Sequence, residues 1–310
     1  MKLCMRTLFI AVVLFASVPC ALSQNLTLML DWFPNVDHLP IYVAQEKGYF
    51  AAEDLQVKII SPSDTADALK LAVAGQVDLA VSYEPQTIIA AAEGLPVRVA
   101  GRLVAHPLTT LLFLKEKGYT SPAELSGQTI GYTVPGLMDV LLEAFAQKNG
   151  ITGYKAVNVG FNIVPALTSG QVAAVMGPFK TYETVTMAAK GIEAAYFELE
   201  KWGIPDYDEL IFICGANTLD AKPDMVAGFR RAVARGLADV RLHPEEALQA
   251  YFKAVPDVDR DIERAAFGKT RPFFAESQEI DSERWQAFAD FALANSLIAR
   301  PVAVAPLLAP

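Results

Sequence analysis

The chain has 310 residues, 20% of them charged, and a formal net charge of −9 at pH 7. Ordinary shares of glycine and proline exclude a collagen-like chain, a long coiled coil and most kinds of disorder. The length allows about two domains, and the acidic balance without basic clusters argues against nucleic acid as a partner. We therefore expect a globular protein of at most two domains.

Residues 1–23 have the layout of a secretory signal peptide. Two cations stand near the start, an apolar run extends from Leu8 to Ala16, and Ala21-Leu22-Ser23 offers small residues for cleavage. The run is shorter than the ~20 residues that a membrane-spanning helix needs. We expect export to the periplasm, and removal of two cations and no anion leaves 287 residues with a net charge of −11.

The cysteines bear on disulfides and on a lipid anchor. Cys4 and Cys20 lie in the leader, so only Cys214 remains after cleavage and no intramolecular disulfide can form. A lipoprotein would carry its lipid on a residue such as Cys20. The preceding Ser17-Val18-Pro19 matches that signal poorly, so we expect simple cleavage, with a lipid anchor at Cys20 as the alternative.

Strands and helices alternate along the first two thirds of the expected mature chain. Apolar periodicity and closing glycines predict the first unit as strands 26–30, 55–60 and 77–81 and helices 41–49 and 65–74. A second unit repeats the scheme with strands 129–132, 155–159 and 172–176, a helix at 138–148 and a short one from 165. This order predicts an α/β protein with mainly parallel sheets.

Two apolar strands, 110–114 and 209–214, are expected to join the units as a hinge. Two connections imply a discontinuous first domain, residues 24–112 and 213–310, and a second domain of residues 113–212. Helices are predicted at 223–240, 243–252, 259–266 and 282–297. The uncharged tail 301–310, with three prolines, is expected to be loosely ordered.

An internal echo points to a cleft between the units. Gly75-Gln76-Val77 leads through a strand to Tyr83-Glu84, and Gly170-Gln171-Val172 leads in the same way to Tyr182-Glu183. Each unit thus offers a loop with an aromatic ring beside a carboxylate. Because ligands of open α/β sheets sit beyond the carboxyl ends of strands, the echo predicts that both pairs face one cleft. Chance likeness of helix–turn–strand units is the alternative.

The sequence offers little for catalysis or metal binding. His38, His106 and His243 stand far apart, and no nucleophile elbow, phosphate loop or dinucleotide motif occurs. We expect no catalytic residue, no metal and no cofactor. Pro135-Gly136, just before the helix at 138, either directs backbone N–H groups at a ligand or is an ordinary loop.

The densest group of unusual residues runs from Asp31 to His38. Trp32 and Phe33 offer aromatic faces at a strand end, and polar side chains follow at Asn35, Asp37 and His38. An aromatic heterocycle needs that combination, because it has flat apolar faces and a polar edge. One of the two rings is expected to cap the core instead, and we favour Phe33.

The same segment, with residues 41–50 (IYVAQEKGYF), resembles the opening of periplasmic substrate-binding proteins of ABC importers. The branch that it resembles binds pyrimidine precursors of thiamine, formylaminopyrimidine and hydroxymethylpyrimidine. Blocks at 80–86, 130–132, 157–161 and 203–210 agree, so the resemblance covers the expected mature chain. It implies a two-domain, type II-like periplasmic-binding-protein fold, with two parallel-rich sheets and a ligand cleft between the domains.

The resemblance also implies a ligand site. Trp32 would stack on the pyrimidine, and Glu183 would accept a hydrogen bond from its amino group. The full predicted set, drawn from both units, is Trp32, Asn35, His38, Tyr83, Glu84, Gly136, Phe179, Lys180, Tyr182 and Glu183. As such a receptor the chain would act as a monomer and deliver a small heterocycle to an ABC permease and its ATPase.

Two departures from the family pattern leave the ligand open. Many relatives read Asn-Thr-Asn-His-Thr-Gly where this chain has Asn35-Val36-Asp37-His38-Leu39-Pro40, and several carry an aromatic residue in place of Lys180. A cation would then point into the cleft, so a binder of a sulfonate, nitrate or similar small anion is the first alternative. A pyrimidine synthase on the same scaffold is the second: His38 matches its histidine, but its cysteine cluster is missing.

Overall fold

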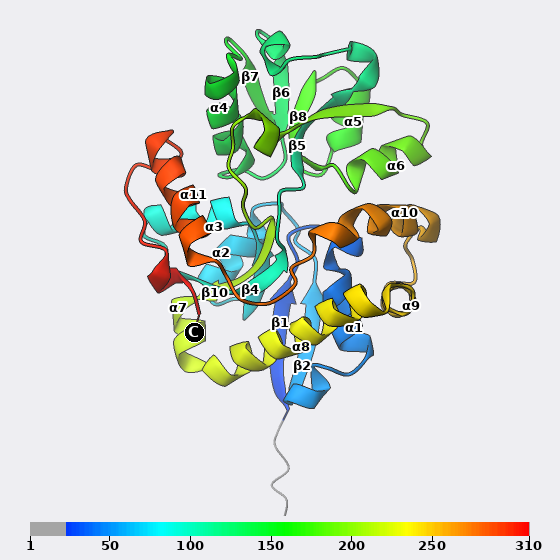
Figure 1. Ribbon diagram of the computed structural model, residues 1–310, viewed down its shortest axis with the longest axis vertical. Helices are drawn as coiled ribbons and strands as arrows, with labels where there is room; N and C mark the ends of the chain where they lie inside the picture. Colours follow the sequence, from blue (N-terminus) through cyan, green and yellow to red (C-terminus); the bar gives the residue numbers. More distant parts are fainter. Residues whose placement is uncertain (1–22, 310) are drawn as a thin grey trace, which may run out of the picture.

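The computed structural model describes residues 23–309, so nearly all of the expected signal peptide, with Cys20, lies outside the described residues. The described chain forms two mixed five-stranded sheets with helices on both sides, and the sheets lie in two lobes (Figure 1). Of the helices in residues 23–309, none is long and apolar enough to cross a membrane.

The strands of the first lobe come from chain segments before and after the second lobe in the sequence. Its sheet has the order β2-β1-β3-β10-β4, with β1 (Gln24–Met29), β2 (Leu55–Ile60), β3 (Leu79–Ser82), β4 (Val97–Val104) and β10 (Leu210–Gly215). β1, β2 and β3 are parallel, and β10 is antiparallel to both of its neighbours. The sheet is therefore parallel except for the strand that returns from the second lobe.

The second sheet repeats this plan. Its order is β7-β6-β8-β5-β9, with β5 (Thr109–Leu114), β6 (Thr129–Tyr132), β7 (Lys155–Asn158), β8 (Ala174–Phe179) and β9 (Ala194–Glu198). β5 is antiparallel to both neighbours, as β10 is in the first sheet. The internal echo in the sequence thus corresponds to two sheets with the same strand order.

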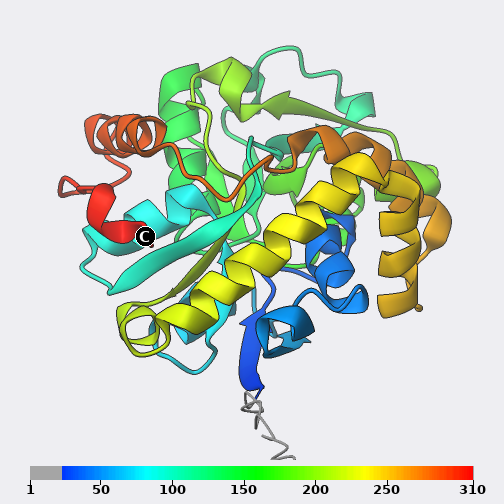
Figure 2. The ribbon, with the colours of Figure 1, turned by 60° about the horizontal axis from the view of Figure 1, so that its bottom comes forward.

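Helices cover both sheets, and one long helix crosses the first. The first lobe holds α1 (Leu39–Glu46), α2 (Asp67–Val73), α3 (Glu84–Ala92), α7 (Ala216–Ala221), α8 (Pro223–Leu242), α9 (Pro244–Ala254), α10 (Arg260–Thr270) and α11 (Ser282–Ala294). The second holds α4 (Met138–Asn149), α5 (Ile163–Thr168) and α6 (Glu183–Ala189). Figure 2 shows α8, in yellow, lying across the face of the first sheet, and Figure 1 shows α10 below α6 of the second lobe.

The predicted elements all have counterparts, and β4, β9, α3, α6 and α7 are additional. Two details differ from expectation. Glu84 and Glu183 do not lie in loops: each is the first residue of a helix. The tail is not loose either, because Leu308 bridges to Val99 and the Ala309 N–H donates to the Val99 carbonyl at 2.9 Å.

The chain passes between lobes before β5 and before β10. The expected boundaries after 112 and 212 fall inside these strands, so the sheets favour crossings near 105–108 and 203–209. Buried Glu209 ties the two crossings together, since its carboxylate accepts the N–H groups of Leu108 at 2.6 Å and Thr109 at 2.8 Å. The division into two domains with a hinge at these segments remains a proposal.

The contact between α8 and α1 requires a glycine, and this gives a stability prediction. A Cβ on Gly236 would lie 2.2 Å from the Pro40 carbonyl oxygen, whereas a Cβ on Gly268 in α10 would meet nothing within 4 Å. We expect Gly236→Ala to lower the free energy of unfolding by about 1–3 kcal/mol, because backbone must move. Gly268→Ala, the matched control, should raise it by up to about 1 kcal/mol through helix propensity. Denaturant unfolding of both variants checks this, and equal stabilities would contradict the packing.

Candidate functional site

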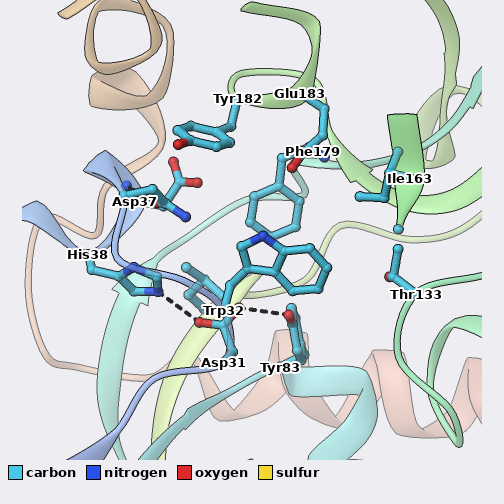
Figure 3. A pocket seen from close by; sticks show the side chains of 13 residues that line it. Asp31, Trp32, Asp37, His38, Tyr83, Thr133, Ile163, Phe179, Tyr182 and Glu183 are labelled. Atoms are coloured by element: carbon cyan, nitrogen blue, oxygen red, sulfur yellow. Dashed lines mark hydrogen bonds and ion pairs between the residues drawn. The ribbon is translucent and has the colours of Figure 1, made fainter. Parts of the chain in front are cut away.

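A pocket lies between the lobes, beyond the ends of β1, β3 and β8 (Figure 3). The space between its lining side chains, counted out into open solvent, is about 380 Å³, whereas the enclosed cavity measures only about 20 Å³. The lining is Asp31, Trp32, Asn35, Asp37, His38, Tyr83, Thr133, Ile163, Gly177, Phe179, Tyr182, Glu183 and Leu210. Both lobes contribute, so the pocket exists only when they are close together.

Asp31, directly beyond β1, organises the first-lobe wall. Its Oδ1 lies 2.8 Å from His38 Nε2, and its Oδ2 accepts the Tyr83 hydroxyl at 2.7 Å, as the dashed lines in Figure 3 show. All three side chains are buried. Nε2 of His38 is occupied by Asp31, whereas its Nδ1 is buried and has no hydrogen-bond partner among the described residues. That nitrogen is available to a ligand.

Asn35 and Asp37 are positioned by a short helical turn, Val36–His38. The side chain of Asn35 caps this turn, since its Oδ1 accepts the Asp37 N–H at 2.7 Å. Asp37 is 1% exposed, and its Oδ1 accepts the Thr270 hydroxyl of α10 at 2.8 Å. Burial raises the pKa of Asp37 to about 7.

The second-lobe wall is formed at the start of α6. Glu183 is its first residue, and its Oε2 accepts the Phe179 N–H at 2.7 Å. Burial raises the pKa of Glu183 to about 7, although this hydrogen bond acts in the opposite direction. The pocket therefore holds a carboxyl group from each lobe whose charge is only partly compensated.

Direct contacts hold the lobes together around the pocket. The Tyr182 hydroxyl of the second lobe donates to Glu263 of α10 at 2.8 Å, and the Thr65 hydroxyl donates to the Thr133 carbonyl at 2.7 Å. Phe161 of the second lobe lies with its ring centre 4.5 Å from the rings of both Trp32 and Phe33. The structure is thus a closed arrangement of the two lobes.

The aromatic pair after β1 divides its roles differently from expectation. Phe33 is 50% exposed, so the prediction that it caps the core is wrong. Trp32 is partly buried and lines the pocket, where Figure 3 shows its indole between the first-lobe wall and Phe179. Trp32 is therefore the ring of this pair that a ligand can contact inside the pocket.

Seven of the ten predicted site residues line the pocket: Trp32, Asn35, His38, Tyr83, Phe179, Tyr182 and Glu183. Glu84 does not, because it is fully buried behind the site and accepts the Asp208 N–H at 2.7 Å. Gly136 is exposed, and its N–H is taken by Asp139 at 2.7 Å. Glu84, the carboxylate of the first echo segment, therefore binds the crossing segment at Asp208 instead of lining the cleft.

Lys180 does not point into the pocket. Its ammonium group pairs with Glu198 at 2.9 Å and Glu200 at 2.5 Å, and it lies over the Phe273 ring. These acidic partners raise the pKa of Lys180 in spite of its burial. The expected cation in the cleft is thus neutralised outside it.

Sequence reasoning missed Asp31, Asp37, Thr133, Ile163, Gly177 and Leu210 as lining residues. Asp31 and Asp37 stand in the segment that was singled out, so their polarity at a strand end was an available signal. Gly177 needs a left-handed φ of 125°, and a Cβ there would lie 2.0 Å from Thr133 Oγ1. Within residues 23–309, no group of acids, histidines and cysteines is arranged to hold a metal ion.

Solved structures with this arrangement define the class of the fold. A Candida albicans protein described as exhibiting the generic periplasmic binding protein fold aligns with a TM-score of 0.72 at 19% identity, covering 91% of this chain and 93% of that one. An alkanesulfonate-binding protein from Xanthomonas axonopodis aligns with a TM-score of 0.73 at 16% identity, covering 92% and 97%. The chain has the periplasmic-binding-protein fold.

Sequence comparison gives the family. A model described as NMT1/THI5 like matches residues 35–247, and the chain belongs to this family. A Haemophilus influenzae protein named for thiamine biosynthesis is 36% identical over 98% of both chains. A formylaminopyrimidine-binding protein from Halalkalibacterium halodurans is 31% identical over 90% of this chain and 88% of its own. A Legionella pneumophila protein named 4-amino-5-hydroxymethyl-2-methylpyrimidine phosphate synthase is 31% identical over 82% and 81%.

The raised pKa values of Asp37 and Glu183 predict how stability depends on pH. Between about pH 4 and 7 the folded protein binds protons that the unfolded chain has released, so the free energy of unfolding falls as pH rises through this window. In Asp37→Asn, the fall in the free energy of unfolding between about pH 4 and 7 should be smaller by roughly 2 kcal/mol. Urea unfolding of the unliganded protein at several pH values measures it. Exposed Asp257→Asn is the control, and a slope that Asp37→Asn leaves unchanged would contradict the burial of an uncompensated carboxyl.

Proposed function

We propose that this protein is a periplasmic receptor that binds a thiamine-precursor pyrimidine, or a similar heterocycle, and delivers it to an ABC permease and its ATPase. The observation that carries the proposal is the pocket between the lobes, where one indole face stands among carboxyl groups from both lobes. An aminopyrimidine offers a flat apolar ring and N–H donors at its edge. The indole of Trp32 can pack against such a ring, and the carboxyl groups can accept from its N–H donors.

The carboxyl groups also favour a pyrimidine over a small anion. Asp31, Asp37 and Glu183 line the pocket, and a sulfonate or nitrate would be repelled by them at low hydration. The cation on which anion binding would depend, Lys180, is engaged by Glu198 and Glu200. The anion alternative therefore has little support from the charges of the site, although a structural neighbour is named for alkanesulfonate binding.

The names of relatives support both a receptor and an enzyme, and the cysteine pattern favours the receptor. Formylaminopyrimidine binding is the role printed for one relative, and pyrimidine phosphate synthase for others. In the described part of the chain the free cysteine is Cys214, which is buried in β10 and does not line the pocket. The related synthases are expected to use a cysteine cluster, and the described residues contain no such cluster.

Glu183→Gln separates pyrimidine binding from anion binding. The amide can still accept the Phe179 N–H, but it removes the negative charge that a ring amino group would meet. We expect calorimetry with hydroxymethylpyrimidine to show about a tenfold loss of affinity, or ~1.4 kcal/mol, because a charge-assisted hydrogen bond is lost.

Exposed Glu116→Gln is the matched control, and it should bind like the wild type. If Glu183→Gln instead tightened binding of the preferred ligand, that ligand would be an anion. If the wild type gave no heat with hydroxymethylpyrimidine, formylaminopyrimidine or a related heterocycle, the proposed ligand class would be wrong. Product formed by the isolated protein would favour the enzyme.

A further inference from the structure

Asp37 leaves one carboxylate oxygen unused inside the pocket. Its Oδ1 accepts the Thr270 hydroxyl, but its Oδ2 is buried and has no hydrogen-bond partner among the described residues. Nδ1 of His38, the next residue, is also buried and has no hydrogen-bond partner among the described residues. Buried polar atoms are nearly always hydrogen-bonded, so two unpaired ones on residues that line the same pocket indicate atoms that a ligand completes.

The groups around Asp37 do not supply a matching positive charge. His38 is the one basic side chain in the pocket lining, and its Nε2 is already paired with Asp31. Glu183 faces Asp37 from α6 and adds negative charge, and Tyr182 lies beside it.

Behind this wall stands α10. It contributes the Thr270 hydroxyl and the carboxylate of Glu263, which accepts from Tyr182, Tyr251 and the Val36 N–H. The nearest lysine described on this helix, Lys269, is exposed and lies 3.5 Å from the Thr184 hydroxyl. His38 lowers the pKa of Asp37 only in part against burial and the charges of Glu183 and Asp31, and no ion pair to Asp37 occurs among the described residues.

We propose that Asp37 makes the site selective for a ligand with a positively charged nitrogen on a side arm, such as an aminopyrimidine that carries an aminomethyl group. The inference rests on the proposed function and narrows its ligand class. With the ring against Trp32, the ring amino group would face Glu183 and the charged arm would reach Asp37, which lie on different walls of the pocket (Figure 3). A charged N–H donor on an ionised carboxylate is a stronger hydrogen bond than a neutral hydroxyl makes.

The protonation of Asp37 agrees with this assignment. Because burial raises its pKa to about 7, the unliganded protein carries a proton on Asp37 in mildly acidic solution and loses it above neutrality. A cationic arm would replace that proton. The preference for a charged arm should therefore be strong above about pH 7 and weak well below it.

The test compares two probes that differ only in the arm, the aminomethyl and the hydroxymethyl derivatives of the same aminopyrimidine. Calorimetry at about pH 7.5 should show that the wild type binds the aminomethyl probe at least tenfold tighter. Asp37→Asn should bring the two affinities within about threefold, since the amide keeps the shape but not the charge. Asp257→Asn, an exposed acid-to-amide change, should keep the wild-type preference.

Equal affinities in the wild type, or a preference for the hydroxymethyl probe, would overturn the inference while the pyrimidine receptor stood. A preference that persisted in folded Asp37→Asn would overturn the role of Asp37. Failure of both probes to bind the wild type would overturn the inference together with the proposed function. If Asp37→Asn did not fold, the wild type alone decides: the preference should shrink several-fold at about pH 5.5, and a constant ratio would contradict the proposal.

Discussion

Closing two lobes over a pocket removes carboxyl groups from water, and each of them must then meet a donor, a proton or a ligand. Asp31 meets His38 and Tyr83, and Glu209 meets the backbone of Leu108 and Thr109. Burial raises the pKa values of Asp37, Glu183 and Glu209 alike to about 7, but Oδ2 of Asp37 has no hydrogen-bond partner among the described residues. The number of hydrogen-bond partners therefore distinguishes the carboxyl groups that hold the structure from Asp37, which we propose meets a ligand.

The repeated sheet plan explains why the acids gather at one place. Parallel strands end at the same edge of a sheet, and residues that follow these edges in both lobes line the pocket. The residues after β1 and β3 in the first lobe thereby meet those after β8 in the second. The hydrogen bond from Tyr182 to Glu263 joins α6 to α10 at this junction, and Glu263 also accepts the N–H of Val36, next to Asp37. Lobe closure and the geometry of the ligand wall are thus coupled through one carboxylate.

The fold was predictable because its signals are local and repeated. Alternating strands and helices, the two Gly-Gln-Val turns and the two connecting strands predicted two α/β units, and the structure and its neighbours confirm the fold. The segment from Asp31 to His38 also identified much of the pocket in advance. Edge strands such as β4 and β9 were missed, because the mixed polarity of Arg98 and Arg102 in β4 hides a strand that packs against β10.

The errors at the site have one physical origin: a side chain's direction depends on partners that are distant in sequence. The echo gave Glu84 and Glu183 equal weight, but Asp208, 124 residues away, takes Glu84 out of the cleft. Lys180 likewise turns to Glu198 and Glu200. The sequence contains no local sign of either pairing. The burial of Asp37 in the pocket wall could not be predicted for the same reason, because Asp37 packs against Thr270 of α10, which is distant in sequence.

The function we propose depends on a pocket that binds a small nitrogen heterocycle, with carboxyl groups at its edge. The most direct measurement is mass spectrometry of the small molecules released by denaturing protein that was purified from its native host without refolding. We expect a stoichiometric aminopyrimidine or similar basic heterocycle, which should be absent from the Trp32→Ala protein purified in parallel. Stoichiometric release of a sulfonate, nitrate or another small anion would contradict it.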